Sequence, residues 1–403
     1  MIHDAPAPTL SALLSNEGLR RREFPAAGGG RVFLAHAGVA PIPARAAEAM
    51  GEYARRATEG AQEGDWVWPR VAATRKAAAR LLGCAIDEIA LLGPTALGLS
   101  LVAHGLLWEP GEEVVYYEDD YPANVYPWSG LRELGVRPVP VRTASLDRLG
   151  AVTWEALAPL LTERTRLVSL ASCHFLSGYR PDLNGIGKRL RERGVLFCVD
   201  GIQTLGAFPT PVEHVDFLSA DSHKWMLGPV GAGIVYVRKE RQSLLRPILR
   251  GAWNIESPGF IAQSEIRYEP GARRYEPGTL NLPGNLGMLA SLELLHALGA
   301  EAVAERLLAA RAYLLEGLFE AGFVLCGGRE GEDLPEPARS GIVTVSHPGV
   351  PSKELMTQLS AAGVVVSMRG DRAGHDYIRL SPHAYNTDAD LEKALALLRQ
   401  AAK

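Results

Sequence analysis

Runs of strand-type residues alternate with helical stretches over the first half of the chain and beyond, from about Arg31 to Arg238. Three strand candidates are nearly continuous in apolar residues: "EVVYY" (113–117), "RLVSLAS" (166–172) and "GVLFCVD" (194–200). Strands of parallel sheets have this composition because helices cover both of their faces. The intervening stretches 96–107 and 184–193 have helical patterns. The alternation therefore predicts repeated β-α-β units and a mostly parallel sheet with helices on both faces.

The rhythm changes after a further strand candidate at 231–240. A Gly/Pro-spaced section (251–284) leads into a long helical stretch (286–322), which we expect to break near Gly299. Three short strands and a helix opened by Thr387, with Asp390 three residues on, complete the chain. This order predicts an α/β protein with a smaller α+β lobe. We expect an N-terminal extension at 1–30, a large domain at 31–255 and a small C-terminal domain at 256–403.

The length and charge of the chain limit what it does. With 403 residues it exceeds what one core usually holds, so we expect two lobes. A net charge of −4 with 22% charged residues gives no bulk attraction to nucleic acid or to an anionic membrane. The four cysteines are far apart and show no metal-ligand spacing, which predicts a reducing compartment, the cytoplasm, and no metal site. The N-terminus shows no signal-peptide pattern.

Lys224 stands out in "SADSHKWMLGP" (219–229), between a histidine and a tryptophan. A lysine that does covalent chemistry must be neutral part of the time, which requires partial burial and nearby charges that lower its pKa. Apolar residues precede Lys224, and the Gly228-Pro229 turn follows it. A surface lysine at the end of a strand fits this stretch about equally well.

Asp200 ends the strand "GVLFCVD", at the edge where open α/β sheets bind ligands. A carboxylate there is suited to pair with the ring nitrogen of pyridoxal phosphate, whose ring then acts as an electron sink. A helix N-cap is the alternative role for Asp200. Gln203 is placed either near the cofactor's phenolic oxygen or on a solvated first turn.

Two further stretches fit the same edge of the sheet. "LLGPTALGLS" (91–100) places Thr95 and Ala96 at the start of a helix, where free N–H groups and the helix dipole favour a phosphate. "EDDYPANVYPW" (118–128) places Tyr121 just past a strand, where its ring is able to stack on a planar heterocycle. Taken singly, an ordinary N-cap and a loop tyrosine explain these residues as well.

With these residues together, the chain resembles the class V aminotransferase family of fold-type-I pyridoxal-phosphate enzymes, which includes cysteine desulfurases, kynureninases and isopenicillin N epimerases. The resemblance runs from about residue 31 to 397 and rests on "VDGIQTLG", "SADSHKW", "EDDYPANVYPW", "SLASCHFLSGYRPDL", "RRYEPGTLN" and "YIRLSPHAYNT". It implies the fold-type-I architecture, with a sheet of the seven-stranded type in the large, cofactor-binding domain.

The resemblance also implies residue roles. Lys224 would hold pyridoxal 5'-phosphate covalently and move the proton at the substrate α-carbon, and Asp200 would pair with the pyridine nitrogen. The remaining implied cofactor contacts are Gln203 near the phenolic oxygen, Tyr121 stacked on the ring, and Thr95, Ala96 and His223 at the phosphate. Arg379 would bind the substrate carboxylate. Thr279 in "GTLN" would reach the phosphate of a neighbouring subunit, which implies a homodimer with shared sites.

Some positions depart from the family pattern. Desulfurases that form a persulfide carry a cysteine shortly before the carboxylate-binding arginine, and here "SMRGDRAGHDYIR" (367–379) has none. Asp221 replaces a phosphate-binding serine, and Leu97 replaces an acidic residue. "FLAHAGVAPIP" (33–43) resembles epimerase-like members and places His36 near the substrate mouth; Arg180, Trp253 and Arg369 are further candidate pocket walls.

We therefore expect a pyridoxal-phosphate enzyme acting at the α-carbon of a small amino acid, of the class V aminotransferase type without the persulfide cysteine. A cysteine or selenocysteine β-lyase and an amino-acid epimerase on the same scaffold stay open as alternatives. A catalytically silent binding homologue is the alternative from another class. A nucleotide-dependent oxidoreductase would need a G-x-G-x-x-G turn after the first strand, and the sequence has none.

Overall fold

A seven-stranded sheet forms the centre of the larger lobe in the computed structural model, which describes residues 6–328 and 331–403. Its strand order is β2-β8-β7-β6-β5-β3-β4. The bounds are Ile89–Leu91 (β2), Glu113–Tyr117 (β3), Arg137–Val141 (β4), Thr165–Ala171 (β5), Leu196–Asp200 (β6), Phe217–Asp221 (β7) and Gly233–Val237 (β8). β8 runs antiparallel to β7 and β2, and the neighbouring pairs from β7 to β4 are parallel. The predicted mostly parallel sheet is confirmed.

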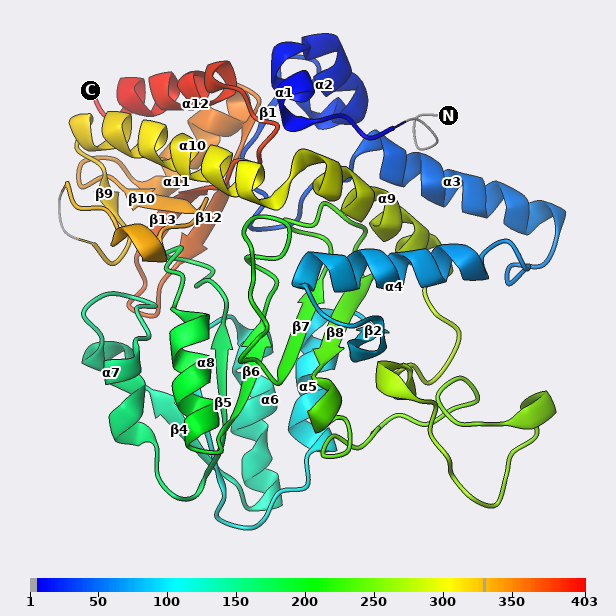
Figure 1. Ribbon diagram of the computed structural model, residues 1–403. Coiled ribbons are helices and arrows are strands. Elements are labelled where there is room, and N and C mark those ends of the chain that lie inside the picture. The colour runs from blue at the N-terminus through cyan, green and yellow to red at the C-terminus, as the bar shows by residue number, and fades with distance from the viewer. Residues whose placement is uncertain (1–5, 329–330) are drawn as a thin grey trace.

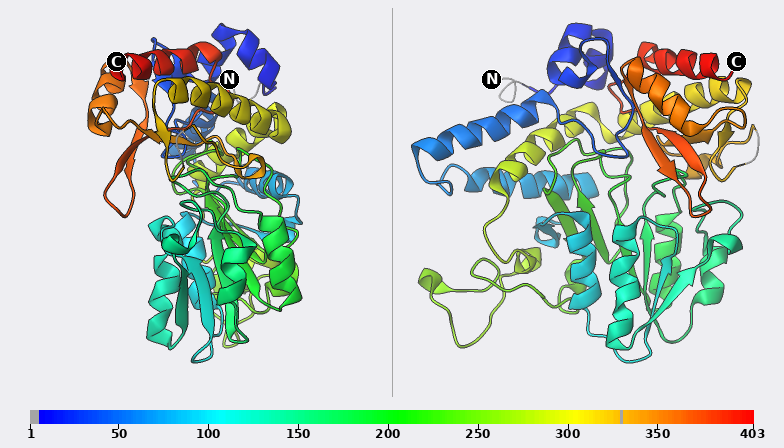
Figure 2. Two further views of the ribbon diagram at one scale, coloured as in Figure 1. Left: turned by 90° about the vertical axis from the view of Figure 1, so that its left-hand side faces the viewer. Right: turned by 180° about the vertical axis from the view of Figure 1, so that it is seen from behind.

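Helices cover both faces of this sheet (Figures 1 and 2). Those of the N-terminal part and the larger lobe are α1 (Leu10–Ser15), α2 (Glu17–Glu23), α3 (Ala44–Glu59), α4 (Trp68–Leu82), α5 (Thr95–Gly105), α6 (Tyr126–Ser129), α7 (Trp154–Leu157) and α8 (Leu183–Glu192). Side chains of α8 pack with Val115 and Tyr117 of β3, whereas those of α5 and α6 pack with Val114 and Tyr116. Because successive strand residues point to opposite faces, these two groups of helices lie on opposite sides of the sheet.

The long helical stretch breaks as predicted. α9 (Leu282–Leu298) and α10 (Ala300–Glu320) meet at Gly299, whose φ of 84° lies in the left-handed region that favours glycine. In the described part of the chain, α9 and α10 have the length and composition to cross a membrane only together, as a pair bent by 79°, and no single helix does.

The smaller lobe is the expected α+β unit. Its sheet has the order β12-β13-β10-β9. The bounds are Val324–Leu325 (β9), Val343–Ser346 (β10), Ser367–Gly370 (β12) and Asp376–Leu380 (β13), with α11 (Ser352–Ala361) and α12 (Asp388–Ala401). Thr387 and Asp390 form the predicted capping box at the start of α12. β1 (Val32–Phe33) pairs in parallel with β11 (Val364–Val365).

The two hydrophobic cores do not divide at residue 255. Val32 and Leu34 belong to the core of the smaller lobe, because β1 pairs with β11. All of α9 packs with the larger lobe, and the two cores change over within α10, between Leu307 and Ala310. The expected boundary at 255/256 followed the change of rhythm in the sequence, which reflects the local pattern and not the long-range packing.

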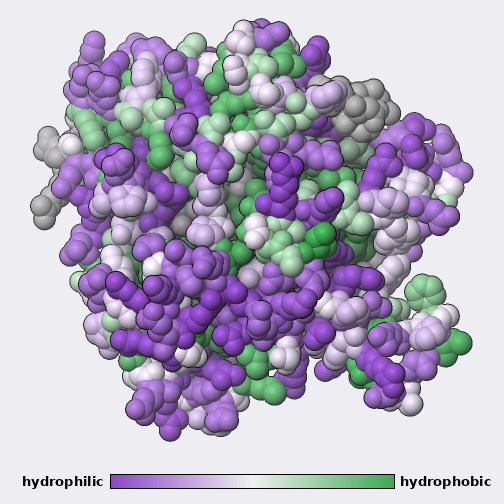
Figure 3. Space-filling view, in the orientation of Figure 1, coloured by the Kyte–Doolittle hydropathy of each residue, from purple (hydrophilic) through white to green (hydrophobic). Residues whose placement is uncertain are grey.

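An arm of irregular chain, residues 246–281, projects from the larger lobe (Figure 1). Its regular structure is limited to short turns at Pro258–Phe260 and Gly271–Tyr275. Phe260 is 72% exposed and Ile261 67% exposed. Apolar side chains are visible on the projecting segment in Figure 3. The arm thus holds large apolar groups away from the core of its own chain.

Candidate active site

Lys224 lies in the turn between β7 and β8 and is buried. The turn is closed by the Gly228 N–H, which donates to Ser222 O at 2.8 Å, and by the Leu227 N–H, which donates to Lys224 O at 3.0 Å. Leu227 adopts a φ of 57°, a conformation that a non-glycine residue holds only when its surroundings require it. The sequence expectation of a partly buried lysine is therefore met, and its backbone is held rigidly.

The charges around Lys224 set its protonation. Burial lowers the pKa of Lys224 to about 8. The negative charge of Asp200 acts to raise this pKa, and the positive charges of Arg379 and Arg369 act to lower it. A neutral amine is therefore available near pH 8, as a nucleophilic lysine requires. Nζ lies 5.2 Å from the centroid of the Tyr121 ring, which is 47% exposed. Lys224 and Tyr121, from separate strand ends, thus come together as the sequence predicts.

Asp200 is buried at the carboxyl end of β6. Its Oδ1 accepts the Ile202 N–H at 3.1 Å, and its Oδ2 accepts from no group in the described residues. Burial raises the pKa of Asp200, and the Lys224 charge acts in the opposite direction. A buried carboxylate with a free oxygen is a suitable partner for a protonated ring nitrogen.

Asp120 is a site residue that the sequence analysis did not single out. Its carboxylate accepts hydrogen bonds from the Tyr121 N–H at 2.7 Å, from Asn124 Nδ2 at 2.9 Å and from the Ala171 N–H at 3.2 Å. Burial and the negative charge of Asp200 raise the pKa of Asp120 to about 7. Its position directly before Tyr121 was the only signal in the sequence. The contacts show that Asp120 fixes the backbone that carries the exposed ring.

The start of α5 lies where the sequence predicts an anion site. Thr95 Oγ1 accepts the Asp221 N–H at 2.9 Å, so its own proton is left to donate. The N–H groups of Leu97 and Gly98 bond to Pro94 O, whereas the Ala96 N–H donates to no described residue. His223 Nδ1 lies 3.2 Å from Asp221 Oδ1, yet both atoms are buried without a hydrogen bond in the described chain. Free donors of this kind suit a phosphate.

Gln203 is held at both ends of its amide. Nε2 donates to Ala37 O at 3.1 Å, and Oε1 accepts from Trp225 Nε1 at 2.9 Å. One amide hydrogen is left for the cofactor contact that the sequence predicts. Trp225, next to Lys224, therefore orients Gln203, a positioning role that the sequence alone did not reveal.

Arg379 approaches from β13 of the smaller lobe. Its side chain is 1% exposed, and Nη1 donates to Phe175 O at 2.6 Å. Nε and Nη2 are buried and have no hydrogen-bond partner among the described residues. Burial and the charge of Arg369 lower the pKa of Arg379 to about 9, so it stays protonated at neutral pH. Two free donors on one rigid guanidinium match the geometry of a carboxylate.

Arg369 is the diagonal neighbour of Arg379. Arg379 pairs with Ser367 across the β12–β13 hairpin, and Arg369 lies two residues further along β12, on the same face. Arg369 has no ion pair in the described part of the chain, and its charge reaches both Lys224 and Arg379. Two unpaired cations therefore point to an anionic substrate.

The structure does not bring every predicted residue to Lys224. His36 is fully buried, with Nδ1 2.9 Å from Ser381 O and Nε2 3.0 Å from Tyr385 OH, so neither ring nitrogen is free for a substrate. Thr279 is exposed at the base of the arm. Trp253 packs against Trp68 on the arm side, at 5.0 Å between ring centroids.

The segment 367–379 is an ordered hairpin. Arg372 forms an ion pair with Asp119 and donates to Glu118 O at 2.6 Å, which connects the hairpin to the loop after β3. The segment contains no cysteine. Cys173, Cys198 and Cys326 are buried elsewhere, and burial raises the pKa of Cys173 to about 11 and that of Cys326 to about 12. Burial also raises the pKa of the partly buried Cys84 to about 12, so no described cysteine is a reactive thiolate at neutral pH.

These residues fit pyridoxal phosphate. A buried lysine whose pKa is lowered to about 8, a buried carboxylate with a free oxygen, an exposed aromatic ring and a helix start with free donors each match one part of that cofactor. The fold and site define a fold-type-I pyridoxal-phosphate enzyme.

Comparison with known proteins gives the family. Residues 32–394 match the family model described as Aminotransferase class-V, and the chain belongs to this family. A probable cysteine desulfurase of Aeropyrum pernix is 27% identical over 403 residues, covering 94% of this chain and 96% of the relative. A probable cysteine desulfurase of Methanothermobacter thermautotrophicus is 28% identical over 275 residues, covering 66% and 67%.

Solved structures share the fold. The apo cysteine desulfurase of Thermococcus onnurineus NA1 matches with a TM-score of 0.84 at 22% identity, covering 94% of this chain and 96% of that one. The complex of the cystine C–S lyase C-DES with cysteine persulfide matches with a TM-score of 0.82 at 21% identity, covering 94% and 99%. The chain is thus a pyridoxal-phosphate enzyme, and its curated relatives include probable cysteine desulfurases.

Proposed function

We propose that this enzyme is a C–S β-lyase for an amino acid that carries a disulfide or thioether and a second carboxylate, with cystine as the model substrate. The observation that carries this proposal is the pair Arg379 and Arg369, neither of which is ion-paired within the described residues. Arg379 binds the α-carboxylate, and Arg369 binds the second one. The segment 367–379 has no cysteine that could accept sulfur. This supports a reaction in which the sulfur is released in a product and is not transferred to an enzyme thiol.

Each residue has a defined task in this reaction. Pyridoxal phosphate, when bound, supplies an electron sink for the α-carbon. Arg379 orients the substrate so that its α-hydrogen faces Lys224, whose neutral Nζ accepts that proton. The Cβ–S bond breaks, and the sulfur leaves with the bonding electrons. One cystine and one water yield one pyruvate, one ammonia and one cysteine persulfide.

The test is a product assay on the purified holoenzyme with cystine, with alanine plus 2-oxoglutarate, and with an enantiopure amino acid. We expect pyruvate and persulfide from cystine without any 2-oxo acid. Amine transfer that requires 2-oxoglutarate, or racemisation without pyruvate, contradicts the proposal. Arg369→Gln should raise KM for cystine about 10-fold while leaving S-methylcysteine, which lacks the second carboxylate, unchanged. Arg372→Gln on the same hairpin serves as the control.

We also propose that the enzyme is a homodimer formed through the arm. This is supported by the exposed Phe260, Ile261 and Ile266 on a segment that its own core does not cover, and by the exposed Thr279 at the base of the arm. Phe260→Asp combined with Ile261→Asp should yield a monomer in light scattering. A dimer that persists in this variant would place the interface elsewhere.

A further inference from the structure

A cavity with polar lining residues lies next to the loop after β6 that carries Gln203 and Thr204. Its volume is about 280 Å³, and it is lined by the chain after β5, the start of α8, residues 204–211 and the smaller-lobe segment 335–338. Of the residues that the sequence analysis placed at the cofactor or the pocket walls, Arg180 lines this cavity, and Lys224, Asp200, Tyr121 and Arg379 do not. An occupant is therefore able to bind while the active site is filled.

Arg180 is the charged group of this cavity. Its guanidinium carbon lies 4.1 Å from the centroid of the Phe208 ring, and Nη2 donates to Pro337 O at 3.2 Å. Nε is buried without a hydrogen-bond partner, and Arg180 forms no ion pair with any acid in the described chain. Burial lowers the pKa of Arg180, because the surroundings disfavour its positive charge. A bound anion would stabilise that charge.

Ser172 gives an independent indication of a ligand. Its side chain is 2% exposed and faces the same cavity, and Oγ has no hydrogen-bond partner among the described residues. Buried hydroxyls usually have a hydrogen-bond partner, so the unpartnered Ser172 Oγ and the unpartnered Arg180 Nε in the lining of one cavity indicate an acceptor that belongs to a ligand. The backbone N–H of Ser172 donates to Asp200 O at 2.8 Å. Ser172 thus connects the cavity to the backbone of Asp200, whose carboxylate belongs to the active site.

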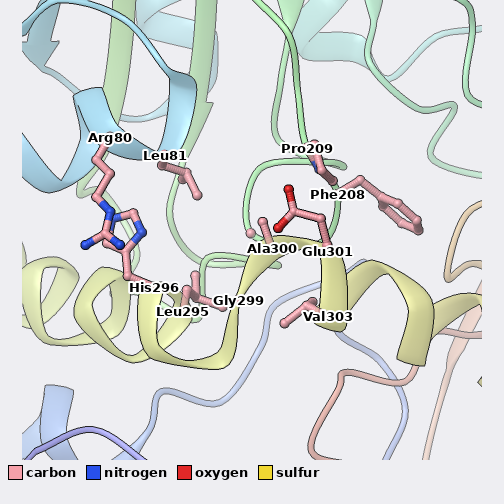
Figure 4. Close-up of a pocket in the computed structure, with 11 residues that line it drawn as sticks. Arg80, Leu81, Phe208, Pro209, Leu295, His296, Gly299, Ala300, Glu301 and Val303 are labelled. Carbon is pink, nitrogen blue, oxygen red and sulfur yellow. The ribbon is translucent and has the colours of Figure 1, made fainter. Parts of the chain in front are cut away.

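A neighbouring cavity lacks these features. It has a volume of about 250 Å³ and lies between the end of α4, the α9–α10 break and the loop with Phe208 and Pro209 (Figure 4). Its His296 has Nε2 3.0 Å from Ala77 O, and no lining side chain has a buried polar atom without a partner within the described residues. Of these two cavities, the one lined by Arg180 and Ser172 has the unpartnered polar atoms that a ligand would satisfy.

We propose that the cavity between Arg180 and Ser172 binds a small oxoanion, the carboxylate or phosphate of a metabolite, with the guanidinium as a two-pronged donor and the Ser172 hydroxyl as a third. Both lobes form its walls: the Arg180 N–H donates to Ala338 O at 2.9 Å, and Ser340 Oγ donates to Gly178 O at 2.6 Å. An anion bound in the cavity therefore contacts segments of both lobes.

The test is calorimetric titration of the holoenzyme with inorganic phosphate and, separately, with acetate. We expect saturable binding of at least one of them, weakened about 10-fold or more in Arg180→Gln and severalfold in Ser172→Ala. Arg189→Gln, which changes an exposed α8 arginine outside the cavity, should leave the affinity unchanged. The anion that binds identifies the metabolite class.

Two outcomes would overturn the proposal. One is equal affinity in the wild type and in both cavity variants. The other is binding that is lost in Arg379→Lys and retained in Arg180→Gln, which would place the anion at the substrate site. Ser172→Ala removes a single atom that has no hydrogen-bond partner in the described residues, so this variant should fold. It therefore provides the test if Arg180→Gln does not fold. This test does not depend on the reaction that the enzyme catalyses.

Discussion

The two halves of the active site differ in the charge of the polar groups that they leave unpaired. In the larger lobe, Thr95, Gln203 and Asp200 are each oriented by a hydrogen bond within the chain. In the smaller lobe, Arg379 has two free buried nitrogens, and Arg369 has no acidic partner in the described residues. The cofactor half therefore leaves a carboxylate oxygen of Asp200 and a ring nitrogen of His223 free, whereas the substrate half leaves cationic nitrogens that an anionic ligand completes.

The difference has an energetic consequence. Leaving a buried cationic nitrogen without an acceptor costs about 1–3 kcal/mol or more, so the fold must stabilise this arrangement elsewhere. A ligand carboxylate recovers that cost on binding. Variants in the larger lobe should therefore affect chemistry and cofactor binding, and variants in the hairpin should affect mainly substrate affinity.

Lys224→Ala should have the largest effect. Removing the amine removes both the covalent link to the cofactor and the base for the α-proton, and kcat should fall at least ~10³-fold. Pyruvate formation and the visible absorbance of the purified protein measure the two losses. Lys239→Ala, which removes an exposed lysine beyond β8, is the matched control. Normal turnover in Lys224→Ala would exclude the whole assignment.

Gly206→Ala should test the rigidity of the cofactor half. Gly206 has a φ of 91°, and an added Cβ would lie 2.4 Å from Trp225 O. We expect a loss of about 3 kcal/mol in the free energy of unfolding, together with weaker cofactor binding, because Trp225 orients Gln203.

Gly194→Ala is the control for backbone strain alone. Gly194 has a φ of 71°, and its added Cβ would meet no atom within 4 Å. It should cost about 1 kcal/mol and leave cofactor affinity unchanged. Chemical denaturation and cofactor titration compare the two variants. Equal losses in the free energy of unfolding for the two variants would show that the backbone around Trp225 shifts readily to accommodate the added Cβ.

The larger lobe was the more predictable from sequence because its elements are local. Buried strands such as 113–117 and 194–200 have continuous apolar runs, and the residues at their ends follow directly. Asp200 and Tyr121 were therefore predicted at one sheet edge by their positions after buried strands, whereas the role of Lys224 depended also on the family resemblance. Arg379 was placed by family resemblance, since no spacing rule brings residue 379 to residue 224.

Long-range pairing explains what the sequence did not reveal. His36 has both ring nitrogens bonded to groups near residues 381 and 385, which no local pattern encodes. Asp120 and Trp225 act through hydrogen bonds to Asn124 and Gln203, and the sequence shows only that they neighbour Tyr121 and Lys224. The hydrophobic cores do not follow the expected boundary at 255/256, because the pairing of β1 with β11 joins residues 332 positions apart in the register Val32 to Val364.

Arg379→Gln should separate the two halves. Loss of the charged two-pronged contact should raise KM for an amino-acid substrate by about 30-fold. Cofactor affinity should stay within about 2-fold of the wild type, because no bond between Arg379 and the cofactor residues is present in the described chain. Steady-state kinetics and cofactor titration give both numbers. A parallel loss of cofactor and substrate affinity would contradict the division between the halves.

The smallest expected effect is a shift in the pH dependence of Lys224. Burial and the charges of Arg379 and Arg369 lower its pKa to about 8, while Asp200 and Asp120 act in the opposite direction. Below that pH the ammonium form dominates, so the rate at which the apoenzyme takes up pyridoxal phosphate should fall as pH decreases through 8. Arg369→Gln removes a positive neighbour, which favours the ammonium and raises the pKa of Lys224. Uptake followed by visible absorbance should then be slower at pH 7 and unchanged at pH 10, with Arg372→Gln matching the wild type at both. An unshifted profile in Arg369→Gln would mean that the unpaired guanidinium of the substrate half does not reach the amine of the cofactor half.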